Sequence, residues 1–209
     1  FVLSMCLGAV LTTQITQYVV HAGHLLPMTA YVTWIAFACG PIWSLGMLSY
    51  TLSVSQMGLS LSTPIKNTTA VLGTLFGLFI FKEWQTTDPW LALIGSVLVV
   101  VCAILLGMCG EKTEKRTHLT GLGIFWALSA AFFFAAYTIP LKFAQMAGGD
   151  SYQINAMMGL GTLLGAIILF LAFTKNRRHW FKASLKDHLW AALAGATWAL
   201  ALIAMTQAI

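Results

Sequence analysis

The sequence has 209 residues, of which 59% are hydrophobic and only 8% are charged, and its mean hydropathy is +0.83. An ordinary soluble domain carries about 25% charged residues, so this composition excludes a soluble domain and indicates an integral membrane protein. The net charge of +5 does not indicate a nucleic-acid partner, because ten of the eleven Lys and Arg residues lie in short connections or at the ends of apolar runs, where basic residues set membrane topology.

Apolar runs of about 20 residues recur along the chain, and a helix of that length crosses the hydrocarbon core of a bilayer. The chain is therefore predicted to be an all-α, polytopic transmembrane helix bundle, a multi-pass protein of the cell membrane. The seven predicted spans are residues 1–20, 31–53, 58–81, 89–109, 119–141, 152–174 and 188–209. The chain opens without an initiator Met and ends inside an apolar run, so we expect a fragment of a longer protein.

Polar and aromatic side chains within the spans are candidates for a binding site. Gln14 and Gln17 share one face of the first span, and each amide can donate and accept, which suits a hydroxylated solute. Glutamine also joins transmembrane helices, so both roles stay open at this stage. Two aromatic pairs could offer flat apolar surfaces to a sugar or an aromatic solute, or could be ordinary core: Trp43 with Tyr50, and Trp126 with Tyr137.

The third span contains a lysine, in "STPIKNTTAVLGTLFGLFIF". Lys66 lies about 12 Å from the near end of this span, too deep for its side chain to reach water easily. A lysine at the centre of a membrane helix costs about 3 kcal/mol, so such residues usually face the bundle interior or a wet cavity. Gly73 and Gly77 continue the same stripe as a GxxxG seam, which predicts close approach by another helix.

Three neighbours of this lysine favour a polar pocket at a broken or bent helix. Thr63 and Asn67 line the adjacent stripe, and Pro64 removes a backbone donor one turn into the helix. We interpret Lys66, Asn67 and Thr63 as substrate-binding residues. The alternative is that Lys66 caps a carbonyl or pairs with another helix purely for packing.

Acidic residues are absent from the interior of every predicted span, so a carboxylate proton relay is not expected. The six Asp and Glu residues lie at span ends or in links: Glu83, Asp88, Glu111, Glu114, Asp150 and Asp187. The sequence also lacks a nucleophile elbow, an HExxH motif and a P-loop, so no enzyme is expected. His21 and His24 are a weak metal signal and are interpreted as solvated loop residues, so neither a metal nor a cofactor is expected.

An internal repeat emerges when the chain is shifted by 155 residues. "GPIW" (40–43) then falls on "GATW" (195–198), and the spans from 1 and 31 fall on those near 152 and 188. This agreement predicts a five-helix unit present twice. Residues 1–110 would hold four spans of the first repeat, and residues 119–209 would hold three spans of the second.

Two stretches resemble a known family. "SVSQMGLSLSTPIKNTTAVLGTLFGLFIFKEW" (53–84) and "GIFWALSAAFFFAAYTIPLKFAQ" (123–145) resemble the EamA-like drug/metabolite transporter superfamily, and in particular its sugar-uptake branch of glucose/ribose porters and rhamnose symporters. This resemblance implies ten helices in two inverted five-helix repeats, a central substrate site and no catalysis. A cation at Lys66 is unusual for a neutral sugar and leaves room for an anionic metabolite.

The sequence thus predicts a secondary transporter that moves a small polar solute, with a sugar favoured, by alternating access. Lys66 would bind the substrate, Asn67 and Thr63 would hydrogen-bond it, and Gln14 and Gln17 would complete the cage. The partners expected are a small-molecule solute and the lipid bilayer, while a coupling proton or sodium ion and a homodimer are left open. An exporter of drugs or amphiphilic metabolites and a non-transporting membrane scaffold are the alternative functions.

Overall fold

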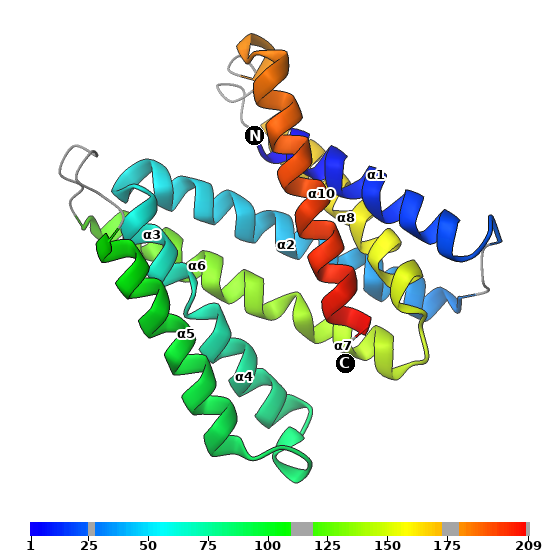
Figure 1. Cartoon of the computed structure of the whole chain (residues 1–209), viewed down its shortest axis with the longest axis horizontal. Helices are drawn as coiled ribbons and strands as arrows, with labels where there is room; N and C mark the ends of the chain where they lie inside the picture. The colour runs from blue at the N-terminus through cyan, green and yellow to red at the C-terminus, as the bar shows by residue number, and fades with distance from the viewer. Residues whose placement is uncertain (25–27, 110–118, 173–179, 208–209) are drawn as a thin grey trace. The chain divides into compact units, whose positions relative to one another are not determined.

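A computed structural model describes residues 1–24, 28–109, 119–172 and 180–207. These residues form helices joined by short turns and contain no strand (Figure 1). The elements in chain order are α1 (Val2–Val20), α2 (Ala30–Met57), α3 (Leu59–Lys66), α4 (Thr69–Ile80), the 3-10 turn η1 (Glu83–Gln85), α5 (Pro89–Cys109), α6 (Gly121–Ala136), α7 (Thr138–Met146), α8 (Ser151–Ala172) and α10 (Leu185–Gln207).

Five of these segments are long and apolar enough to cross a membrane, which confirms the prediction of a polytopic helical membrane protein. They are α1, α2, the continuous stretch Gly121–Met146 that includes α6 and α7, α8, and α10. The predicted span 58–81 is divided into α3 and α4, and the predicted span 89–109 forms α5.

The division of the third span lies between Lys66 and Thr69. The hydroxyls of Thr68 and Thr69 each donate, at 2.7 Å, to the carbonyl oxygens of Ile65 and Lys66 respectively. Threonine side chains thus occupy carbonyls that a continuous helix would pair with backbone N–H groups. The helix is therefore broken, as expected, and the break comes directly after the lysine, between Lys66 and Thr69.

The described helices gather into two compact units. The first contains residues 1–44 and 140–209, and the second contains residues 45–139. In the first unit, α1 packs along both α10 and α8. Gly8 of α1 meets the backbone of Ala192, and Gly195 of α10 meets the backbone of Met5, so two glycines bring α1 and α10 together without intervening side chains.

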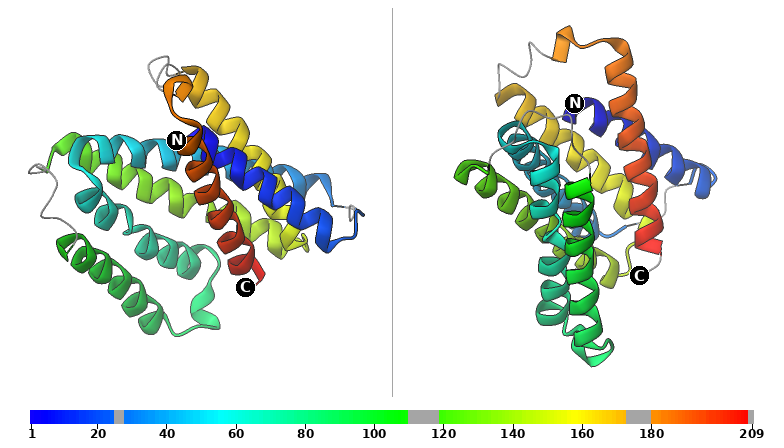
Figure 2. Two further views of the ribbon diagram at one scale, coloured as in Figure 1. Left: turned by 45° about the horizontal axis from the view of Figure 1, so that its top comes forward. Right: turned by 60° about the vertical axis from the view of Figure 1, so that its left-hand side comes forward.

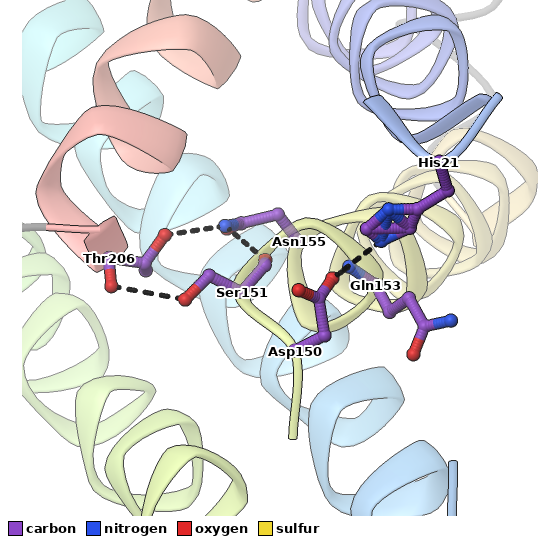
Figure 3. A network of polar contacts seen from close by, with 6 residues as sticks. All are labelled: His21, Asp150, Ser151, Gln153, Asn155 and Thr206. Atoms are coloured by element: carbon purple, nitrogen blue, oxygen red, sulfur yellow. Dashed lines mark hydrogen bonds and ion pairs between the residues drawn. The ribbon is translucent and has the colours of Figure 1, made fainter. Parts of the chain in front are cut away.

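Helices paired by the 155-residue shift run in opposite directions within the first unit. His21, just after α1, pairs with Asp150, just before α8, so α1 ends where α8 begins. Likewise α10 ends there, because Ser151 bonds to Thr206, while α2 begins there, because Gly149 packs on Val32 (Figures 1 and 3). The helix pairs α1/α8 and α2/α10 are therefore each antiparallel across this end of the unit.

In the second unit, α3 and α4 pack against both α5 and α6 (Figure 2). Gly58, with φ of 78°, makes the reversal from α2 to α3 in a single residue, a backbone conformation that favours glycine. The face of α6 within this unit is lined by small buried residues, namely Ala127, Ala130, Ala131 and Ala135. Small side chains on α6 let the neighbouring helices approach its backbone closely.

A buried hydroxyl pair fixes the position of α3 in this unit. The Ser53 hydroxyl lies 2.9 Å from that of Ser62 and 3.0 Å from the carbonyl oxygen of Gly123. Both serines have no exposed surface. This short chain of hydrogen bonds joins α2, α3 and α6 one turn before the lysine.

Candidate functional site

The Lys66 ammonium lies between two aromatic rings of the second unit. Its Nζ is 5.6 Å from the centre of the Tyr50 ring on α2 and 5.7 Å from the centre of the Phe134 ring on α6. Lys66 is half-buried at the end of α3. The lysine thus faces protein, as the sequence predicted.

The two rings offset some of the cost of placing this charge in a membrane. A cation–π contact contributes about 0.5–1 kcal/mol at an exposed site and more when it is desolvated. The insertion cost of a central lysine is about 3 kcal/mol. Water, backbone carbonyls or a negatively charged solute close to Nζ would stabilise the charge further.

The Tyr50 ring is held in place by Thr63. Their hydroxyl oxygens are 2.8 Å apart, and Thr63 precedes Lys66 by three residues on α3. A tyrosine whose hydroxyl is engaged keeps one ring orientation, so this contact positions the aromatic face beside the ammonium. The predicted residues Thr63, Lys66 and Tyr50 are therefore brought together by the structure.

Asn67 lies at the break itself, as the residue that caps α3. Its backbone N–H donates to Thr63, and its backbone carbonyl accepts from Ala70. Among the described residues its side-chain amide has no hydrogen-bond partner, and it is half-buried. The neighbouring Thr69 hydroxyl lies 3.2 Å from the carbonyl oxygen of Ala131, which ties the start of α4 to α6.

Among the residues described, no carboxylate lies within 4.0 Å of the Lys66 ammonium. The ion pair between His21 and Asp150 belongs to the first unit. Glu111 and Glu114 lie outside the described residues. The described part of the chain also holds no group of three or more metal-ligating side chains. The groups present at this break, an ammonium, an amide and a hydroxyl together with aromatic faces, can bind a solute non-covalently.

Among the described residues, no other helix uses the predicted GxxxG seam of this helix. A Cβ placed on Gly73 would meet nothing within 4 Å in the described structure, and one placed on Gly77 would meet the Glu83 carboxylate. The neighbouring helices α5 and α6 approach α4 over other residues. Small residues at this spacing permit close helix approach but do not enforce it.

Gln14 and Gln17 belong to the first unit and act there within the helix packing. The Gln14 amide donates to the carbonyl oxygen of Ala156 at 3.0 Å, joining α1 to α8. Gln17 is 3% exposed. Because Lys66 lies in the other unit, the cage that would combine these residues stays a prediction.

The predicted aromatic residue Trp43 has a partner that the sequence analysis did not identify. Its ring lies 4.4 Å from that of Trp198, centre to centre, with the planes tilted by 35°. These two residues are the last letters of "GPIW" and "GATW", so the repeat places identical residues in contact with each other. The alignment of these two motifs in the sequence could have indicated that the two tryptophans are equivalent.

The members of the other predicted aromatic pair lie on α6 and just after it. Trp126 packs edge-on against the adjacent Phe125, with ring centres 5.3 Å apart, and Tyr137 lies at the junction of α6 and α7. Their role in binding stays a prediction.

A polar network at one end of the first unit was also not predicted (Figure 3). The His21 ring nitrogen lies 3.1 Å from Asp150, with only 8% of the histidine side chain exposed, so its interpretation as a solvated loop residue is wrong. The Asn155 amide donates to the Ser151 carbonyl at 2.8 Å and to the Thr206 hydroxyl at 2.7 Å. This network ties the ends of α1 and α10 to the start of α8.

Comparison with known proteins gives one family. The family model described as "Sugar transport protein" matches residues 2–209. A "Probable glucose uptake protein GlcU" of Bacillus cereus (strain ATCC 10987) is 26% identical over 196 residues, which cover 90% of this chain and 67% of that protein. A protein of Lactiplantibacillus plantarum described as a sugar uptake protein is 26% identical over 145 residues, covering 68% of this chain and 50% of that protein.

The chain therefore spans between half and two thirds of the length of these relatives. No solved structure matches it. The relatives are named as uptake proteins and not as enzymes, and this confirms both the sugar-uptake resemblance and the expectation of a non-enzyme. Membership of the wider drug/metabolite transporter superfamily stays a prediction.

Proposed function

We propose that this chain, which belongs to the sugar transport protein family, forms part of a secondary transporter that moves a sugar across a membrane by alternating access. The observation that carries the proposal is the cluster at the break between α3 and α4, where Lys66 and Thr63 both contact Tyr50 and Asn67 caps α3. Interrupted membrane helices with polar side chains at the break are typical of solute sites in secondary transporters.

The antiparallel arrangement of equivalent helices supports the mechanism. α1 with α8 and α2 with α10 are related by the 155-residue shift and run in opposite directions. Helical repeats of opposite orientation can exchange conformations, which would expose a central site first to one side of the membrane and then to the other. The contact between Trp43 and Trp198 fits this relation, since equivalent residues meet where a two-fold axis passes between two repeats.

In this account each polar group near the break has a role in binding. The Asn67 amide would donate to and accept from sugar hydroxyls, Thr63 would hold the Tyr50 ring beside the site, and Lys66 would donate from its ammonium. A role of Gln14 and Gln17 in binding stays a prediction from the sequence. An aromatic face suits the apolar surface of a sugar ring.

Uptake by proteoliposomes containing the complete protein tests this function. We expect saturable entry of labelled sugar, and an apparent affinity about tenfold weaker in Asn67→Ala, since losing one hydrogen bond to a solute in an apolar site costs about 1.4 kcal/mol. Thr197→Val is the matched control, because the Thr197 hydroxyl is exposed and bonds only to carbonyls of its own helix.

The same liposomes separate the alternative functions. A membrane scaffold would give no sugar entry in any variant, and an exporter of amphiphilic compounds would transport dyes or drugs in preference to sugars. A pH gradient and a sodium gradient, imposed in turn, identify the coupling ion from the gradient that drives accumulation.

A further inference from the structure

We propose that the solute bound at Lys66 is an acidic sugar, a monosaccharide that carries one carboxylate, such as a hexuronate. This inference rests on the proposed function, because it assigns the substrate class of the same site. The juxtaposition that carries it is an ammonium 5.6 and 5.7 Å from the centres of two rings, one of them held by a threonine hydroxyl, with an asparagine next to the lysine in the chain and no carboxylate within 4.0 Å among the described residues.

The charge of Lys66 has no acidic counterpart within ion-pair distance in the part of the chain that the structure describes. All the acidic residues of the sequence fall outside the interior of its apolar spans. Buried charges in proteins are paired or coordinated. A neutral sugar would leave this ammonium with dipoles alone, whereas a carboxylate on the solute would complete an ion pair each time the solute binds.

The basic side chains near Lys66 in the described structure bear on the charge of the solute. The described part of the second unit contains two lysines, Lys66 and Lys82, and Lys82 lies beyond the end of α4. The 12 residues of α4 separate the two by about 18 Å at 1.5 Å per residue. One nearby ammonium matches a carboxylate with a single charge better than a phosphate ester, which carries up to two charges at neutral pH.

The uncharged neighbours suit the rest of a sugar acid. Asn67 presents an amide without a protein partner among the described residues, and amides recognise hydroxyl groups by donating and accepting. The Tyr50 ring, fixed by Thr63, adds an apolar face. The site thus offers one group for the carboxylate and several for the hydroxylated ring.

Competition in proteoliposomes containing the complete protein tests the inference. Uptake of labelled glucuronate is measured against unlabelled glucose, galacturonate and glucose 6-phosphate. We expect the two uronates to compete at concentrations at least about tenfold lower than glucose or the phosphate ester, a preference of the size that one additional charge contact provides.

Variants of the lysine assign this preference to its charge. Lys66→Met and Lys66→Gln should lower the ratio of uronate to glucose affinity at least about tenfold, while Lys186→Met, at an exposed lysine, should leave it unchanged. The ratio is measured within each variant, so it does not depend on the amount of folded protein, and if neither variant folds the wild-type competition decides.

The outcomes separate the two proposals. Preferred uptake of glucose, preferred binding of the phosphate ester, or a ratio unaffected by both lysine variants would overturn the acidic-sugar inference and leave sugar transport standing. Failure to transport any sugar, acidic or neutral, would overturn the proposed function and this inference with it.

Discussion

Replacing Gly195 with alanine tests the crossing of α1 and α10 in the first unit. A Cβ at this position would lie against the carbonyl group of Met5, with the carbonyl carbon at 2.8 Å and the backbone nitrogen of Ala9 at 3.0 Å. Real Cβ atoms essentially never come closer than 3.0 Å to such atoms. Because the obstacle is backbone, it cannot rotate away, and the two helices must separate.

The matched control is Gly73→Ala, where a Cβ meets open space in the described structure. Both glycines lie inside helices, so both substitutions gain the same helix propensity, up to about 1 kcal/mol. The difference between the two variants therefore isolates the clash. Adding one methyl group to a tightly packed site costs about 1–3 kcal/mol, and we expect the upper end because backbone atoms are involved.

Unfolding of the detergent-solubilised protein by increasing amounts of denaturing detergent measures this difference. We expect Gly195→Ala to unfold earlier than the wild type and Gly73→Ala to unfold at the same point or later. Equal stability of the two variants would refute the close crossing of α1 and α10.

Three further experiments test contacts inside the two units by the same unfolding measurement. Ser53→Ala should cost about 1 kcal/mol, because it breaks the buried link among three helices, whereas Ser55→Ala, at an exposed hydroxyl bonded within its own helix, should change stability by less than about 0.5 kcal/mol. Asn155→Ala should cost about 1–2 kcal/mol by releasing the end of α10 from α8, and an unchanged midpoint would contradict that role. A double-mutant cycle with Trp43→Ala and Trp198→Ala should give a coupling of about 0.5–1.5 kcal/mol, while strict additivity would show that the rings do not interact.

Local features of the sequence predicted the helices well. Apolar runs of membrane-spanning length indicated the helices, and Pro64 with its polar neighbours Thr63 and Asn67 indicated a broken helix at this place. These features depend on residues close together in the chain. Composition and hydrogen-bonding rules are sufficient to find them.

Contacts between distant segments were harder to predict. His21 and Asp150 are 129 residues apart, and their pairing depends on where α1 and α8 end relative to each other. No described helix packs on the Gly73 seam, because a stripe of small residues allows close approach but does not identify the helix that will use it. The contact between Trp43 and Trp198 was predictable only in outline, from the internal repeat.

Counterflow in proteoliposomes tests the central claim most directly. Vesicles containing the complete protein are loaded with unlabelled solute and diluted into labelled solute, with glucose and glucuronate tested in parallel. A carrier with its site at Lys66 should give a transient accumulation of label above equilibrium, reduced at least about tenfold in Lys66→Met and preserved in Lys186→Met. Label that rises only to equilibrium, or an overshoot that Lys66→Met leaves intact, would contradict a carrier that binds its solute at this lysine.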